Sequence, residues 1–172
     1  GIKAFTLSLI ETAIRVSGGK VSASIISQIV DLGKEQLNQP VRLINNVNEV
    51  LEKLQPHYRL IVATKGDLLD QETKLMKSGL ADYFHHIEIM SDKGERNYLD
   101  LIHHLDIKPE EFLMVGNSLK SDVIPVLNLG GYGVFVPYHT TWLHEYVDEE
   151  RMNHERYFKI DNLGMLPELF GR

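Results

Sequence analysis

The chain has 172 residues, of which 43% are hydrophobic and 24% charged, with a formal net charge of −6. This length suits one domain, or a core domain with a small accessory one, and the acidic balance does not favour a nucleic-acid-binding surface. The absence of cysteine excludes disulfides, thiolate metal sites and a cysteine nucleophile and agrees with a cytoplasmic location, while no apolar run approaches the ~20 residues that a membrane span needs.

Residues 1–40 are predicted to form an antiparallel pair of helices. Apolar residues recur at helical spacing through residues 2–16 and stop before a pair of glycines. Ser22 is placed to cap a second amphipathic helix. That helix should end near Pro40, because the residue before a proline avoids the helical region.

From about residue 41 the pattern alternates between short apolar strands and amphipathic helices. The strands are expected at residues 59–64, 86–90, 112–116, 132–137 and 156–160. The helices are expected after Asn46, as a cap, and at residues 68–77, 95–105, 121–128 and 163–169. Such alternation is typical of an α/β fold with a Rossmann-like parallel sheet.

Polar residues follow three of these strands directly. They are Thr64, Lys65 and Gly66 after the first, Asp92 and Lys93 after the second, and Asn117, Ser118 and Asp122 after the third. In parallel sheets, ligands bind at the carboxyl ends of the strands. Hydroxyl groups and backbone amides hold anionic oxygens, a lysine adds a positive charge, and a carboxylate suits Mg²⁺. Each residue alone has an ordinary structural role, such as helix capping, but the set favours a phosphate and cation site.

These motifs resemble those of the haloacid dehalogenase-like hydrolase superfamily, most of whose members are Mg²⁺-dependent phosphatases. LIVAT, ending at Thr64, matches the family's second motif, and SDK, ending at Lys93, matches the third. GNSLKSD, ending at Asp122, matches the fourth, which usually begins with Gly-Asp. The resemblance covers about residues 41–160, and residues 1–40 resemble the helical cap of such proteins.

The resemblance implies a Mg²⁺ cofactor and a small phosphorylated substrate, with no nucleic-acid partner and no membrane. It assigns catalysis to Thr64 and Lys93, substrate binding to Thr64, Lys65, Gly66 and Lys93, and the metal to Asp122, Asn117 and Ser118. Asn117 stands where the family usually has an aspartate, so Asp122 is expected to be the main metal carboxylate.

The family's first motif, D-x-D-x-T/V on the first core strand, is missing from this sequence. In the family, its first aspartate accepts the phosphoryl group and its second is the general acid and base. That strand lies between the strands ending at Thr64 and Gly116, so its loss would leave two apolar edges open. We therefore expect a further N-terminal segment of roughly 40–70 residues, or a partner chain, to complete the sheet, and expect this chain alone to be inactive.

Two other functions remain open. A metal-free dehalogenase of the same superfamily would attack carbon with the same aspartate, although Asp122 favours the phosphatase. A non-catalytic binding remnant of the fold is the second alternative. Beyond the fourth strand, His139, Trp142 and His144 could contact substrate, but a tryptophan that anchors a surface loop is the simpler interpretation.

Overall fold

The computed structural model describes residues 1–138 and 152–170, and the chain divides into two compact units. Unit 1 consists of Gly1–Arg42 and Gly66–Gly79, and unit 2 consists of Leu43–Lys65 and Leu80–Arg172. Within the described residues, no helix is both long and apolar enough to cross a membrane.

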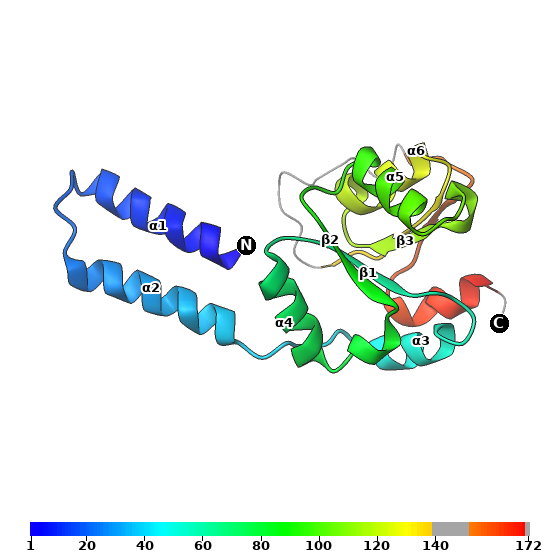
Figure 1. Cartoon of the computed structure of the whole chain (residues 1–172), viewed down its shortest axis with the longest axis horizontal. Coiled ribbons are helices and arrows are strands. Elements are labelled where there is room, and N and C mark those ends of the chain that lie inside the picture. Colours follow the sequence, from blue (N-terminus) through cyan, green and yellow to red (C-terminus); the bar gives the residue numbers. More distant parts are fainter. Residues whose placement is uncertain (139–151, 171–172) are drawn as a thin grey trace. The chain divides into compact units, whose positions relative to one another are not determined.

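Unit 1 is helical and contains α1 (Ile2–Val16), α2 (Ala23–Asn38) and α4 (Leu68–Ser78). Helices α1 and α2 pack against each other as the predicted pair (Figure 1). Ser22 caps α2, because its hydroxyl accepts a hydrogen bond of 3.3 Å from the backbone N–H of Ile25. Asp67 caps α4 in the same way, and Nζ of Lys3 in α1 lies 3.1 Å from Asp67 and 3.0 Å from Asp70.

Unit 2 is an α/β domain that contains all five predicted strands in the predicted order, and the helix predicted at residues 163–169 is present as a 3₁₀ helix. Its strands are β1 (Ile61–Lys65), β2 (His86–Met90), β3 (Leu113–Gly116), β4 (Tyr132–Phe135) and β5 (Tyr157–Lys159). Its helices are α3 (Val47–Leu54), α5 (Glu95–His104) and α6 (Ile124–Asn128), with 3₁₀ helices at Ala81–Tyr83, Pro109–Glu111 and Leu163–Phe170. All observed strand pairs are parallel, which confirms the predicted fold class.

Two local predictions differ from the structure. Asn46 precedes α3 in a left-handed conformation, with φ of 65°, and its side chain makes no capping hydrogen bond. Residues 121–128 do not form one regular helix, because a π-helical turn at Leu119–Val123 precedes α6. Pro125 explains the irregularity: it lacks an N–H group and cannot continue the α-helical hydrogen-bond ladder.

The parallel sheet is divided into two parts. Strand β1 pairs with β2, with Lys65 opposite Met90, while β3, β4 and β5 form the second part in that order. In the part of the chain that the structure describes, β1 and β3 are not paired with each other. Both strands therefore carry an open edge.

Helices pack against both faces of the sheet. On one face, Tyr98 and Ile102 of α5 pack in a single apolar cluster with Ala63 of β1 and Met114 of β3. On the other face, Val50 and Leu54 of α3 share a cluster with Leu60, Leu113 and Leu166. The two sheet parts thus share their hydrophobic cores, although no backbone hydrogen bonds join them in the described residues.

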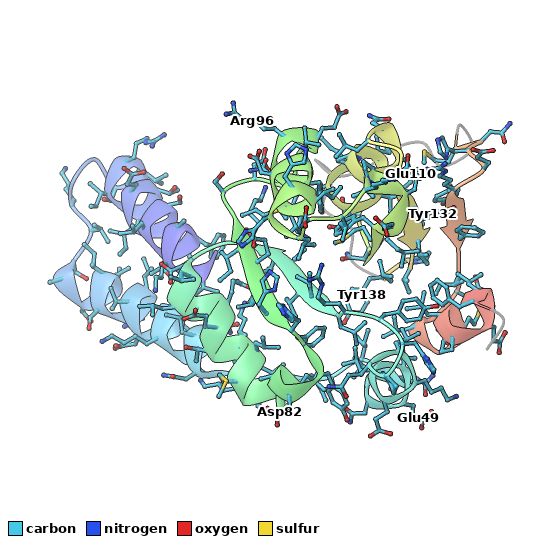
Figure 2. The ribbon with its side chains drawn as sticks, turned by 45° about the vertical axis from the view of Figure 1, so that its right-hand side comes forward. Glu49, Asp82, Arg96, Glu110, Tyr132 and Tyr138 are labelled. Carbon is cyan, nitrogen blue, oxygen red and sulfur yellow. The ribbon has the colours of Figure 1, made fainter. Side chains whose placement is uncertain are left out.

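Arg156 stabilises the position of β5 at the edge of the second sheet part. Tyr132 lies in β4 and is labelled in Figure 2. Cζ of Arg156, just before β5, lies 5.2 Å from the centroid of the Tyr132 ring. The guanidinium group of Arg156 also donates a hydrogen bond to the carbonyl oxygen of Gly130. A guanidinium over an aromatic face is attracted by the ring quadrupole, so this contact fixes β5 against β4.

Candidate active site

A buried ion pair joins Lys93 to Asp122. Nζ of Lys93, which follows β2, lies 2.7 Å from Oδ1 of Asp122, which follows β3. The side chains are only 16% and 5% exposed, so water screens the pair weakly. The fold therefore brings together two residues that the sequence assigned to one site from separate motifs.

The turn after β3 holds the Asp122 carboxylate from the other side. Oδ2 of Asp122 accepts a hydrogen bond of 3.0 Å from the backbone N–H of Ser118, and the N–H of Asp122 donates to the Ser118 carbonyl at 2.9 Å. The Ser118 hydroxyl, itself buried, accepts from the N–H of Ser121 at 3.1 Å. Ser118 thus shapes the turn with its backbone and its side chain together.

Gly116 has no side chain and so leaves space for the Asp122 carboxylate. A Cβ atom at this position would overlap the carboxylate and Cβ of Asp122. The strand end must therefore be glycine if Asp122 is to fold back over it. Gly116 is the first residue of the fourth motif and Asp122 is the last. The glycine is needed because any larger residue would prevent Asp122 from packing over the strand end.

Tyr98 of α5 stabilises the π-helical turn through a hydrogen bond to its backbone. Its side chain is fully buried, and its hydroxyl donates a hydrogen bond of 3.0 Å to the carbonyl oxygen of Ser121. In a regular helix the residue four positions later would donate to that carbonyl, but here that residue is Pro125, which has no N–H. The tyrosine of α5 thus takes over a hydrogen bond that the helix itself cannot make.

Burial raises the pKa of the Tyr98 hydroxyl above its ordinary value near 10, and the charge of Asp122 adds to the effect. The unfolded chain releases this proton above about pH 10, while the folded protein keeps it. Stability from this group is therefore complete below pH 10 and is lost as the pH rises further.

Tyr98→Phe is expected to cost about 1 kcal/mol at neutral pH, because the hydrogen bond from the tyrosine hydroxyl to the Ser121 carbonyl is lost. The variant should also show a shallower loss of stability above pH 10 than the parent protein. Urea denaturation between pH 7 and 11 measures both effects. Parallel pH profiles for the two proteins would contradict the role of this hydroxyl.

Thr64 and Lys65 are the last residues of β1, and Gly66 follows them. Thr64 lies opposite Ile89 in the β1–β2 register, so the ends of these strands are adjacent. Nζ of Lys65 lies 3.0 Å from Oδ1 of Asp92, which the sequence placed at the same edge but to which the family resemblance assigned no individual role. Gly66 has φ of 147°, a conformation that favours glycine, and belongs to unit 1.

Asp122 and Asn117 carry oxygen atoms of the kind that Mg²⁺ binds. Asp122 supplies a carboxylate, and Asn117 is an exposed residue with a neutral amide oxygen. Mg²⁺ at phosphate sites keeps several waters and uses one or two carboxylates with substrate oxygens. No group of three His, Cys, Asp or Glu side chains within residues 1–138 and 152–170 is arranged to hold a metal, so this pair needs further ligands.

The sequence did not predict the contact between Tyr98 and Ser121. Tyr98 showed only as an inward-facing helix residue, and its partner Ser121 could not be read from a pattern. His139, Trp142 and His144, the candidates for substrate contact, lie outside the described residues.

The sequence matches the family model described as "Haloacid dehalogenase-like hydrolase" over residues 3–130. It is 26% identical over 126 residues to the human N-acylneuraminate-9-phosphatase, covering 70% of this chain and 51% of that protein. It is 29% identical over 86 residues to the glyceraldehyde 3-phosphate phosphatase of Pyrococcus furiosus, covering 47% of this chain and 36% of that protein. The chain thus spans about half the length of the curated relatives that it matches first.

Solved structures share the fold. A haloacid dehalogenase-like family hydrolase from Xanthomonas campestris superposes with a TM-score of 0.89 at 36% identity, covering 99% of this chain and 72% of that chain. A HAD phosphatase from Thermococcus onnurineus gives a TM-score of 0.64 at 20% identity, covering 98% and 79% of the two chains. The second likeness concerns the fold alone.

Proposed function

Because the chain belongs to the haloacid dehalogenase-like hydrolase family, we propose that the full-length protein is a cytoplasmic, Mg²⁺-dependent phosphatase of a small phosphorylated metabolite. The observation that carries the proposal is the Lys93–Asp122 pair at the carboxyl ends of the strands. The phosphatases among its relatives support the reaction type.

In this proposal, Thr64 and the backbone amide of Lys65 bind the oxygens of the transferring phosphoryl group, next to Gly66. Lys93 neutralises negative charge that develops as the phosphorus is attacked. Asp122, with Asn117, would hold Mg²⁺, which when bound offsets the charge of the phosphate. Ser118 keeps the Asp122 carboxylate in place through its N–H. The helices of residues 1–40 would act as a cap that excludes water and selects the substrate.

The nucleophile is proposed to lie on a strand outside this sequence. Its aspartate would form a bond to phosphorus as the alcohol leaves, and water would then hydrolyse the aspartyl-phosphate. The open edges of β1 and β3 support a parallel strand between them, because the two strands share a hydrophobic core on one face. On the other face, Leu60, just before β1, packs in the same cluster as Leu113 of β3. Such a strand would satisfy backbone groups on both edges and bring its carboxyl end to Lys93.

The proposed activity is tested with p-nitrophenyl phosphate, with and without Mg²⁺, on the full-length protein and on residues 1–172. We expect hydrolysis that requires Mg²⁺ and only in the full-length protein, with Lys93→Met at least 100-fold slower, as expected for a lost electrostatic contact. Adding the upstream segment as a separate polypeptide should restore activity to residues 1–172.

The same assay separates the alternatives. Halide release from a 2-haloacid without Mg²⁺ would replace the phosphatase with a dehalogenase. Absence of both activities in the full-length protein would favour the binding remnant.

A further inference from the structure

We propose that Lys3 is a positioning residue for phosphate binding, because its ammonium group holds and partly neutralises the carboxylates of Asp67 and Asp70. These carboxylates follow the end of β1, where the proposed phosphatase function places the phosphoryl group, so the inference rests on that function. It gives the helices of residues 1–40 a direct part in binding the anion.

The first observation is an ion-pair network within unit 1. Nζ of Lys3 in α1 lies 3.1 Å from Oδ1 of Asp67 and 3.0 Å from Oδ1 of Asp70. Lys3 and Asp67 are 64 positions apart in the chain, so the network joins α1 to the start of α4. Within residues 1–138 and 152–170, no other lysine or arginine pairs with either carboxylate.

The second observation is the place of these carboxylates in the chain. Asp67 is the N-cap of α4 and comes two positions after Lys65, the last residue of β1. Oδ1 of Asp67 accepts a hydrogen bond of 3.1 Å from the backbone N–H of Asp70, which fixes the first turn of α4. Negative charge at this turn would repel a phosphate bound at the end of β1, because unit charges near a protein surface still interact over several ångströms.

Electrostatic coupling within the network supports this role. The pKa of Lys3 is raised, first by its hydrogen bond to Asp70 and then by its hydrogen bond to Asp67. The pKa of Asp67 is lowered, first by Lys3 and then by the backbone N–H of Asp70. Both shifts favour the charged forms, so the ammonium group offsets one of the two negative charges beside the proposed phosphate position.

The network should affect anion binding more than stability. The side chains of Lys3 and Asp67 are 50% and 48% exposed, and an exposed ion pair contributes little to stability. Its charges still act on a phosphate at the adjacent turn, because salt screens charges only beyond about 8 Å at physiological ionic strength. Removing the ammonium group should therefore weaken phosphate binding while urea unfolding stays close to that of the parent protein.

Calorimetry of inorganic phosphate binding to the full-length protein with Mg²⁺ tests the role of Lys3. Lys3→Met should weaken binding about fivefold, the size expected for one unit charge near a bound anion. Adding Asp67→Asn to Lys3→Met should restore most of the lost affinity. Asparagine keeps the helix cap and removes the excess negative charge.

Lys20→Met is the matched control, since Lys20 is an exposed lysine in the loop between α1 and α2, at the other end of α1 from Lys3 (Figure 1). It should leave phosphate binding unchanged. The effect of Lys3→Met should shrink in 1 M NaCl, where charges are screened beyond about 3 Å. A purely structural role of Lys3 would not show this dependence on salt.

Three results would overturn the inference. They are phosphate binding by Lys3→Met as tight as in the parent protein, a loss that Asp67→Asn does not reverse, and no phosphate binding by the parent protein.

The readout does not depend on catalysis. Hydrolysis of p-nitrophenyl phosphate together with unchanged phosphate affinity in Lys3→Met would retain the phosphatase and reject the role of Lys3. Phosphate binding that depends on Lys3, in a protein that hydrolyses no phosphate ester, would support the role of Lys3 and reject the phosphatase.

Discussion

Replacing Asp122 with alanine is expected to lower the free energy of unfolding by about 3 kcal/mol and to abolish the proposed hydrolysis. The change leaves the ammonium group of Lys93, whose side chain is 16% exposed, without its carboxylate. It also removes the acceptor for the buried N–H of Ser118. Removing one member of a buried ion pair is costly, because the remaining charge stays out of water without compensation. Urea denaturation of the full-length protein measures the loss.

Asp122→Asn separates the two contributions. Asparagine keeps the volume of the side chain and an oxygen for the Ser118 N–H, but its NH₂ group cannot accept from Lys93. The charge and the hydrogen bond to Lys93 are therefore lost while the Ser118 N–H keeps its acceptor, so the destabilisation should be smaller. Lys93→Met with Asp122→Asn should be at least about 1 kcal/mol more stable than the sum of the single changes predicts. Strict additivity would show that the 2.7 Å contact contributes no coupling.

Gly116→Ala is expected to destabilise the protein by about 2 kcal/mol, within the usual range for overpacking, and to slow the proposed hydrolysis more than tenfold. The new methyl group would overlap the Asp122 side chain. The carboxylate would have to turn away from the strand end and from Lys93. Stability and turnover should therefore fall together, which unfolding curves and steady-state rates on the same preparations can establish.

Gly94→Ala provides the matched control, because it adds the same methyl group beside Lys93. The nearest heavy atom to a Cβ at Gly94 is Oδ1 of Asn97, at 3.7 Å, which is an ordinary contact. Gly94 is the N-cap of α5, where alanine is less favourable than glycine, so the effect of Gly94→Ala should be about 0.5–1 kcal/mol and below that of Gly116→Ala. Equal tolerance at Gly116 and Gly94 would mean that the Asp122 side chain does not need to fold back over the strand end.

The functional argument rests on residues that lie far apart in the chain and meet at one edge. Lys93 and Asp122 are 29 positions apart and in contact, and Lys65 meets Asp92 across 27 positions. The proximity of these residues could be predicted because the strands are parallel, and the carboxyl ends of parallel strands lie at the same edge of the sheet. The sequence patterns identified the strand ends, and the direction of the strands brought them together.

The sequence by itself determined the order and type of the elements, because apolar periodicity and capping residues act over a few positions. Ser22 begins α2 and the helix ends just before Pro40, both as expected. It also determined the candidates Thr64, Lys93 and Asp122, since each directly follows a recognisable apolar strand or its turn.

Only the tertiary structure decided the details on which the chemistry depends. The hydrogen bond from Tyr98 to Ser121 spans 23 positions and compensates for a proline in the next turn, which no periodic pattern encodes. The edges of β1 and β3 are open because these two strands do not pair with each other in the described residues. The exposed ion pair of Lys65 and Asp92 depends on the positions that their charged groups reach in the folded chain. Such features depend on side-chain packing between distant segments, and that packing exists only once the chain has folded.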